Sequence, residues 1–304
     1  MVPHWWPSVL HRIIILLLRP EKQMTCFGGL PPFYSDKDTA KIVVVPVPYD
    51  GTSTWIRGSA GGPTALIDAS ANMELYDIET DTEVYKQGIF TDVPVKGFEN
   101  PGLMVHMTRQ RITDWLEKGK YVVTLGGEHS VSLGAIQAHK DRYPGMCVLQ
   151  LDAHTDLRQE YEGSRFNHAC VMARVRELMP LTQAGIRSMD IEEKEFIVPG
   201  RVFYMEKMIT NQSWVQQVID TLARDVYLTF DLDVLDPSIM PSTGTPEPGG
   251  MDWYTAISLI RQVVLQRNLV GFDIVELCPE KHNKAPDFLA AKLLYKTLSY
   301  IYNK

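Results

Sequence analysis

The chain of 304 residues contains few cysteines and no metal-binding pair of them. The four cysteines include no Cys-x-x-Cys spacing; they are Cys26, Cys147, Cys170 and Cys278. This pattern excludes a disulfide scaffold and a cysteine-rich zinc site, and it is typical of a reducing compartment. No apolar run approaches the roughly 18 residues that a helix needs to cross a bilayer. We therefore expect a cytoplasmic protein without a membrane span.

An excess of positive charge is also absent. The 30 Lys and Arg residues against 37 Asp and Glu residues leave a net charge of −7. This charge disfavours sequence-independent binding to nucleic acid or to an anionic membrane surface. We therefore expect a cationic or neutral small ligand and no nucleic-acid partner.

The N-terminal segment differs from the rest of the chain. Residues 13–18 form the longest apolar run, but no small-residue cleavage site of a signal peptide follows it. Residues 1–23 show neither helical nor strand periodicity, whereas the composition from Met24 onward is that of an ordinary domain. We interpret residues 1–23 as a disordered or non-native extension, expect the native start at Met24, and predict one folded domain over residues 24–304.

Short β-branched runs alternate with amphipathic stretches from residue 40 to the end. Strands are predicted at 41–47, 121–125, 147–151, 201–204, 226–230 and 270–275, and helices at 64–77, 104–118, 130–140, 169–179, 212–224, 252–267 and 286–302. Strands that are apolar on both faces and separated by helices indicate a parallel sheet covered on each side. The sequence thus predicts a single three-layer α/β/α domain with a mostly parallel sheet. In such sheets ligands bind beyond the carboxyl ends of the strands.

Three of these strands run directly into polar clusters. The clusters are Gly126-Gly127-Glu128-His129-Ser130, Asp152-Ala153-His154-Thr155-Asp156 and Asp231-Leu232-Asp233-Val234-Leu235-Asp236-Pro237. In an extended segment residues i and i+2 point the same way, so Asp152 is expected to face the same point as His154. The same spacing predicts that Asp231 and Asp233 face one point.

The clusters contain six nitrogen or oxygen donors and no thiolate, which favours Mn²⁺ over a structural zinc ion. The six are His129, Asp152, His154, Asp156, Asp231 and Asp233. Six ligands exceed what one ion needs beside an open catalytic position. Carboxylates shared between ions would let them hold two, about 3.5–4 Å apart as in other two-metal sites.

Each cluster alone also has a simpler interpretation. An Asp at a strand end often caps the following helix. The third cluster resembles a calcium loop, but an EF-hand needs Gly at its sixth place and Glu at its twelfth, and those places hold Asp236 and Ser242. Three such clusters at strand ends of one chain favour a joint metal site.

The three clusters together resemble the motifs of the ureohydrolase family, the arginases and agmatinases, which hydrolyse guanidinium groups to urea with a di-manganese centre. They are similar to the family's Gly-Gly-Asp/Glu-His-Ser, Asp-Ala-His-x-Asp and Asp-x-Asp-x-x-Asp-Pro. Residues 48–52 and 244–250 also look like family segments, and the similarity runs from about residue 40 to 300. The resemblance implies an arginase-like fold, a ureohydrolase catalytic domain over residues 24–304, and a homo-oligomer, a trimer or hexamer.

The resemblance also implies a role for each metal ligand. His129 and Asp156 would bind one manganese ion, and His154 and Asp233 would bind the other. Asp152 and Asp231 would bridge both ions. The ions would lower the pKa of a shared water so that hydroxide exists near neutral pH.

Two further residues match catalytic positions of the family. Glu276 corresponds to the glutamate that pairs with the substrate guanidinium, although from the residues alone it is equally a cap where the chain leaves the sheet. His168 corresponds to a histidine proposed to shuttle protons, although by itself it is typical of a surface or helix-start histidine. The chemistry requires a proton donor, because the departing amine must gain a proton.

The loop of residues 157–167 is expected to contact the substrate tail. It lacks the Asn- and Ser-rich run with which arginases bind the amino acid carboxylate, and residues 160–164 look like agmatinases. Glu160 and Glu162 would suit a tail that ends in a bare ammonium group. We therefore predict hydrolysis of agmatine to putrescine and urea, a step of polyamine biosynthesis.

Other functions stay open at this point. Arginase, guanidinobutyrase and formimidoylglutamase activities share the same metal motifs. A dinuclear metallophosphoesterase would need an Asn-His pair after a strand, and the pair found, Asn167-His168, follows none of the predicted strands. A non-enzymatic metal-binding protein would be favoured if a ligand were missing, and none is.

Overall fold

The computed structural model describes residues 26–304, so the predictions for residues 1–23 and for a start at Met24 lie outside the described residues. Eight strands form one sheet in the order β2-β1-β3-β8-β7-β4-β5-β6, and every neighbouring pair is parallel. The strands are β1 (Ile42–Val47), β2 (Ile89–Thr91), β3 (Tyr121–Gly126), β4 (Cys147–Leu151), β5 (Leu181–Ile186), β6 (Val202–Tyr204), β7 (Asp225–Asp231) and β8 (Asn268–Val275).

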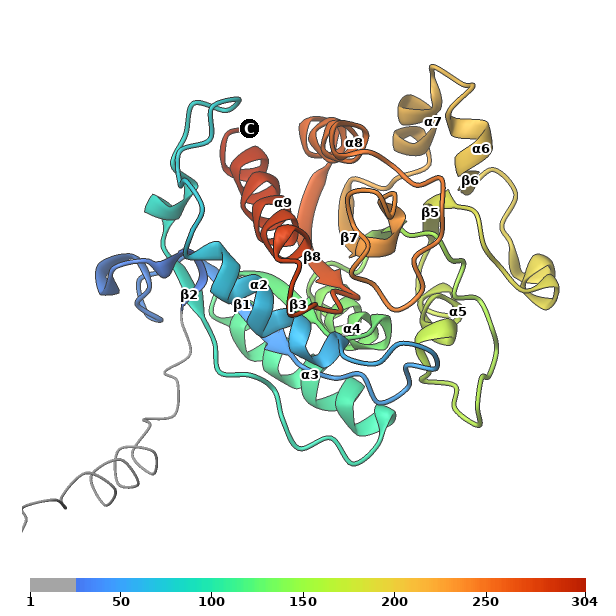
Figure 1. Cartoon of the computed structure of the whole chain (residues 1–304), viewed down its shortest axis with the longest axis horizontal. Helices are drawn as coiled ribbons and strands as arrows, with labels where there is room; N and C mark the ends of the chain where they lie inside the picture. The colour runs from blue at the N-terminus through green and yellow to red at the C-terminus, as the bar shows by residue number, and fades with distance from the viewer. Residues whose placement is uncertain (1–25) are drawn as a thin grey trace, which may run out of the picture.

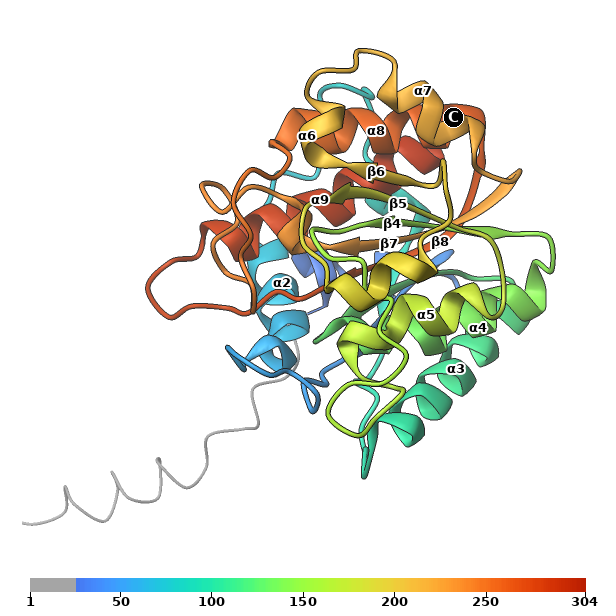
Figure 2. The same ribbon diagram turned by 90° about the vertical axis from the view of Figure 1, so that its right-hand side faces the viewer.

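Helices cover both faces of this sheet (Figures 1 and 2). They are α2 (Gly62–Ser70), α3 (Pro101–Glu117), α4 (Ser132–Arg142), α5 (Val171–Arg176), α6 (Met205–Met208), α7 (Trp214–Asp220), α8 (Trp253–Gln266) and α9 (Ala285–Tyr302). Short 3-10 helices complete the chain: η1 (Phe27–Gly29), η2 (Pro32–Tyr34), η3 (Ser59–Gly61), η4 (Val84–Gln87), η5 (His129–Val131), η6 (His168–Cys170), η7 (Ile191–Phe196) and η8 (Leu232–Val234). The predicted three-layer α/β/α fold with a parallel sheet is confirmed. The assignment of residues 24–304 to one catalytic domain stays a prediction.

The sheet separates two apolar cores, which explains why its strands are apolar on both faces. Ile42 and Val44 of β1 belong to the cluster that includes α2, α7, α8 and α9. Val43 and Val45, which alternate with them, belong to the cluster with α3, α4 and α5. Alternate side chains of a strand point to opposite faces, so a strand between two helical layers must be apolar throughout.

The structure differs from the predicted elements in a few places. Two strands were not predicted, β2 and β5. β2 is only three residues long, and in β5 the polar Thr182 and Gln183 together with Gly185 interrupt the apolar pattern. Gly185 has a φ of +97° at an irregularity in the pairing with β6. The first predicted helix was extended too far, because α2 ends at Ser70, whose hydroxyl donates to the carbonyl of Ile67.

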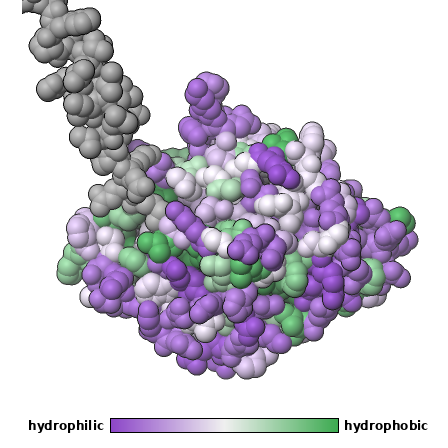
Figure 3. All heavy atoms as spheres, turned by 90° about the horizontal axis from the view of Figure 1, so that it is seen from below, coloured by the Kyte–Doolittle hydropathy of each residue, from purple (hydrophilic) through white to green (hydrophobic). Residues whose placement is uncertain are grey.

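Figure 3 shows one face of the molecule, where hydrophilic side chains predominate and hydrophobic ones occur in small groups. Within residues 26–304, no helix has both the length and the apolar composition that a bilayer span requires.

Four strands at the centre of the sheet, β3, β8, β7 and β4, are direct neighbours. Because they are parallel, their carboxyl ends lie at the same edge of the sheet. The register pairs Leu125 with Ile274, Asp231 with Val275, and Leu151 with Phe230. The residues that follow these strands are therefore brought together, although they are up to about 150 positions apart in sequence.

Candidate functional site

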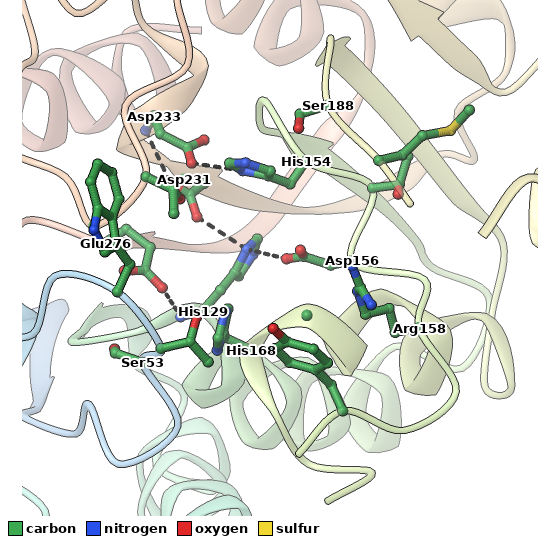
Figure 4. Close-up of a pocket in the computed structure, with 18 of the residues that line it drawn as sticks. Ser53, His129, His154, Asp156, Arg158, His168, Ser188, Asp231, Asp233 and Glu276 are labelled. Atoms are coloured by element: carbon green, nitrogen blue, oxygen red, sulfur yellow. Dashed lines mark hydrogen bonds and ion pairs between the residues drawn. The ribbon is translucent and has the colours of Figure 1, made fainter. Parts of the chain in front are cut away.

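A cavity of about 280 Å³ lies at this edge of the sheet, and seven of the eight predicted site residues line it: His129, His154, Asp156, His168, Asp231, Asp233 and Glu276. Figure 4 shows how these side chains face one another. The eighth residue, Asp152, is fully buried and lies within 3.6 Å of both His129 and His154. The structure therefore brings all eight predicted residues together.

His129 points its Nδ1 atom at three carboxylates. This atom lies 3.0 Å from Asp152 Oδ2, 3.0 Å from Asp156 Oδ2 and 3.2 Å from Asp231 Oδ2. The other ring nitrogen, Nε2, lies 2.9 Å from the hydroxyl of Thr229.

The Thr229 hydroxyl determines the tautomer of His129. It donates its proton to Asp273 Oδ1 at 2.7 Å, so it accepts the hydrogen bond from Nε2–H of His129. The neutral imidazole then has a lone pair on Nδ1. A histidine held by a carboxylate-linked partner in this way is the usual arrangement of a metal ligand.

His154 forms the second group. Its Nδ1 atom lies 2.9 Å from Asp233 Oδ2 and 3.6 Å from Asp152 Oδ1, and its Nε2 atom lies 3.8 Å from Glu247 Oε1. Two triads can each hold a metal ion, His129 with Asp152 and Asp156, and Asp152 with His154 and Asp233. Asp152 is common to both, which is the arrangement that a bridging carboxylate requires.

Backbone N–H groups orient three of the carboxylates. Asp233 N donates to Asp231 Oδ1 at 2.9 Å, Ala153 N donates to Asp233 Oδ1 at 3.0 Å, and His154 N donates to Asp152 Oδ1 at 2.6 Å. The predicted reason why Asp231 and Asp233 face one point was wrong, because Asp233 lies in the 3-10 helix η8 and not in an extended segment. The two aspartates meet at the cavity nevertheless.

The carboxylates of the site repel one another. Burial and the nearby charge of Asp152 raise the pKa of Asp156 to about 7. Burial and the charges of Asp233 and Asp152 raise the pKa of Asp231 well above its usual range. Although burial opposes it, the carboxylates raise the pKa values of His129 and His154 well above their usual range, so the protonated rings are the cations of the metal-free site. Bound metal ions would take over this role and leave His129 with a lone pair on Nδ1. His129 Nδ1 also has no hydrogen-bond partner among the described residues. The donor set therefore fits divalent metal ions.

Glu276 is fixed at the wall of the cavity by backbone contacts. Its φ of +67° lies in the left-handed region, and its N–H donates to the carbonyl of Gly127 at 2.7 Å. Its carboxylate oxygen Oε1 accepts a hydrogen bond from His129 N at 2.8 Å. Burial and the charge of Glu128 raise the pKa of Glu276 well above its usual range. A cation placed against this carboxylate would favour its charged form.

His168 is held by Thr52. The His168 N–H donates to Thr52 Oγ1 at 3.0 Å, and Nδ1 lies 3.2 Å from the same oxygen. Because the Thr52 hydroxyl donates its own proton to Glu128 Oε1 at 2.6 Å, Nδ1 carries the hydrogen and Nε2 is left as an acceptor. Burial lowers the pKa of His168 to about 4, so the ring is neutral near pH 7.

The outer wall of the cavity contains an ion cluster that the sequence did not reveal. Arg158 donates to Asp190 Oδ2 at 3.0 Å, lies 3.4 Å from Glu193 Oε1, and stacks 4.6 Å over the ring of Tyr161. These four residues line the cavity. Glu160 and Glu162, which were expected to suit an ammonium tail, are exposed and are not among the residues that line it.

Further polar residues behind the site were also missed, although the sequence holds a signal for them. Gln150 and Asp273 each interrupt a run of apolar residues in a strand that is buried on both faces. A polar side chain at such a position must find a partner inside the protein. Asp273 contacts Thr229, and Gln150 contacts Asp152.

Comparisons with known proteins identify the family of the chain. A family model described as the arginase family matches residues 40–299. An N(1)-aminopropylagmatine ureohydrolase of Synechocystis sp. is 38% identical over 86% of this chain and 89% of that protein. An agmatinase of Pyrococcus horikoshii is 30% identical over 86% of this chain and 92% of that protein. The crystal structure of agmatine ureohydrolase of Thermoplasma volcanium matches with a TM-score of 0.79 and 31% identity, covering 88% of this chain and 91% of that one.

These findings define the class of the protein as a hydrolase with an arginase-like fold. The chain belongs to the arginase family and is a ureohydrolase, an enzyme that acts on small guanidino compounds.

Proposed function

We propose that this ureohydrolase cleaves agmatine to urea and putrescine with two Mn²⁺ ions. The observation that carries the proposal is the pair of His/Asp triads that share Asp152 in one cavity with Glu276. His129 and Asp156 would hold one ion and His154 and Asp233 the other, with Asp152 and Asp231 between them. When bound, the ions would supply a water acidic enough to give hydroxide near neutral pH.

Glu276 would bind and orient the substrate. A planar guanidinium donates paired N–H bonds to a carboxylate, and such charge-assisted pairs fix the direction of the cation. The hydrogen bond from His129 N holds this carboxylate beside the first triad. The guanidinium carbon would then lie next to the metal ligands, which is the orientation that hydrolysis requires.

His168 would move the proton that releases the amine. Its ring is neutral because it is buried, and the hydrogen bond to Thr52 leaves Nε2 able to accept a proton. A neutral imidazole at the cavity wall can take up a proton during the addition step and give it to the departing nitrogen. Urea and the amine then leave.

The outer wall favours a tail without a carboxylate. Arg158, Asp190 and Glu193 together carry a net charge of −1, and Asp190 is 32% exposed. An ammonium group is attracted by this wall, whereas a carboxylate is repelled by Asp190. A second candidate substrate is N(1)-aminopropylagmatine, because relatives that are 33–38% identical to this chain carry that name.

One assay separates these substrates. Mn²⁺-loaded protein is incubated with agmatine, N(1)-aminopropylagmatine, arginine, 4-guanidinobutyrate and a phosphodiester, and urea and phosphate are measured. We expect the highest kcat/KM for urea release with agmatine, and loss of this activity in Glu276→Gln. A higher kcat/KM with N(1)-aminopropylagmatine would identify that compound, and not agmatine, as the substrate. Phosphate release or the absence of urea would refute the proposed function.

The cellular compartment of the enzyme is inferred from its composition, and its oligomeric state from the family resemblance. We propose that it works in the cytoplasm as a homotrimer or a homohexamer. Mass measurement in solution tests the assembly, and a monomer would contradict it.

A further inference from the structure

Two glutamines lie behind the metal ligands, in neighbouring strands. Gln150 of β4 and Gln183 of β5 are directly paired in the parallel register. Gln150 is 0% exposed and Gln183 is 2% exposed. A buried amide is costly unless its donors and acceptors are paired, so two of them side by side point to a specific arrangement.

The hydrogen bonds of the pair run in one direction toward Asp152. Gln183 Nε2 donates to Gln150 Oε1 at 2.6 Å and to the carbonyl of Thr155 at 2.8 Å. Gln150 Nε2 donates to Asp152 Oδ2 at 2.6 Å and to the carbonyl of His154 at 3.2 Å. The Gln150 oxygen is thus occupied by Gln183, and its NH₂ group must face Asp152.

This direction matters because Asp152 is the carboxylate shared by the two triads. An N–H donor fixes the orientation of a carboxylate oxygen, and an amide does so without adding a charge of its own. If the amide were reversed, its oxygen would repel Asp152. Gln183 therefore controls which end of Gln150 meets the metal ligand.

We propose that Gln150 and Gln183 are positioning residues that orient Asp152 for both metal ions, with Gln183 acting through Gln150. This inference rests on the two-metal site proposed above. It concerns the affinity for the ions, so it can be tested without the reaction.

The variants follow from the hydrogen-bond pattern. Gln150→Glu keeps the shape of the side chain but replaces the donor with a negative charge beside Asp152. Gln183→Glu leaves Gln150 in place but favours reversal of its amide, because a carboxylate at position 183 accepts where the glutamine donated. The exposed Gln216 of α7 provides the matched control, Gln216→Glu.

Mn²⁺ affinity is measured by calorimetric titration of the metal-free proteins, and thermal unfolding without metal checks that each variant is folded. Loss of an outer partner of a metal ligand typically weakens binding by about 10–100-fold. We expect a loss of about 100-fold for Gln150→Glu, about 10-fold for Gln183→Glu, and none for Gln216→Glu.

The relation between the two glutamines has its own test. Because Gln183 acts through Gln150, the double variant Gln150→Leu/Gln183→Leu should bind Mn²⁺ no more weakly than Gln150→Leu alone. If the Gln150 variants do not fold, the Gln183→Glu affinity decides the question.

Folded variants that bind Mn²⁺ as tightly as the wild-type protein would overturn the inference and leave the metal site intact. Additive losses in the double variant would overturn the coupling between the glutamines. A wild-type protein that does not bind two ions would overturn both the metal site and the inference.

Discussion

Replacing Asp156 with Asn should stabilise the metal-free protein while it weakens metal binding. The carboxylate lies 3.0 Å from His129 Nδ1 in a buried site, and its pKa is raised from 3.8 to about 7 by burial and by Asp152. Three pKa units correspond to roughly 4 kcal/mol of unfavourable free energy when the group is charged. We expect Asp156→Asn to recover about 2–4 kcal/mol of the free energy of unfolding at pH 8.

The effect has a defined pH dependence. Because the pKa of Asp156 is higher in the folded than in the unfolded state, the folded protein binds the extra proton between about pH 4 and pH 7. The penalty in the wild-type protein is therefore absent below about pH 4, grows through this window, and is complete above about pH 7. The stability difference between variant and wild type should shrink in the same way as the pH falls from 7 toward 4.

Chemical denaturation of the metal-free proteins at pH 8 and pH 5 measures this difference, and Asp114→Asn on an exposed position of α3 is the control. A second measurement adds Mn²⁺. Each ion at about 100 times its Kd stabilises the folded state by about 2.7 kcal/mol, so the wild-type protein should gain about 5 kcal/mol and the variant no more than about half. Equal metal-free stability of variant and wild type, or an equal gain from Mn²⁺, would show that Asp156 is not a metal ligand under electrostatic strain.

Three further outcomes are expected. Glu276→Gln should lower kcat/KM for agmatine by about 100-fold or more, because the charged pair with the guanidinium is lost. Metal analysis of this variant should still find two ions. An unchanged kcat/KM would show that Glu276 does not bind the substrate. Gly271→Ala should destabilise the fold by about 1–3 kcal/mol in urea denaturation, because a Cβ atom there would lie 2.2 Å from His139 Nε2; unchanged stability would mean that this ring can move aside. Burial lowers the pKa of His139 from 6.5 to about 4, so on acidification the unfolded chain takes up a proton before the folded one. The free energy of unfolding should therefore fall as the pH drops below 6.5, by about 2 kcal/mol at pH 5. His139→Leu should lose less of its free energy of unfolding on acidification.

Much of the fold was predictable because the strands are short and apolar on both faces. Six of the eight strands and all of the long helices follow from hydrophobic periodicity. β5 was missed because Gln183 and Gly185 break its pattern, and the reason for each lies elsewhere in the chain. Gln183 donates to Gln150, and a Cβ atom on Gly185 would lie 2.5 Å from a side-chain atom of Val234. Such contacts between distant segments leave no local signal.

The candidate site, like the fold, was predictable only in part. His129, Asp152 and Asp231 were predictable because each stands at or just after a strand end, where the topology of a parallel sheet collects ligands. Gln150 lies two residues before its partner Asp152. Thr229 and Asp273 lie inside other strands, and only pairing across the sheet brings Thr229 to His129 and Asp273 to Thr229. The ion cluster of Arg158, Asp190 and Glu193 joins the loop after β4 to the start of η7, so no spacing within one segment reveals it.

The position of β8 in the sheet has a consequence for the order in which the molecule can be assembled. This strand is the last in the sequence, yet it lies between β3 and β7, which carry His129 and Asp231 at or just beyond their ends. During synthesis β3 and β7 cannot be joined by strand pairing until residues 268–275 have left the ribosome. A nascent chain that stops short of them therefore cannot bring the proposed ligands together, and we expect metal binding only after residues 268–275 have been synthesised.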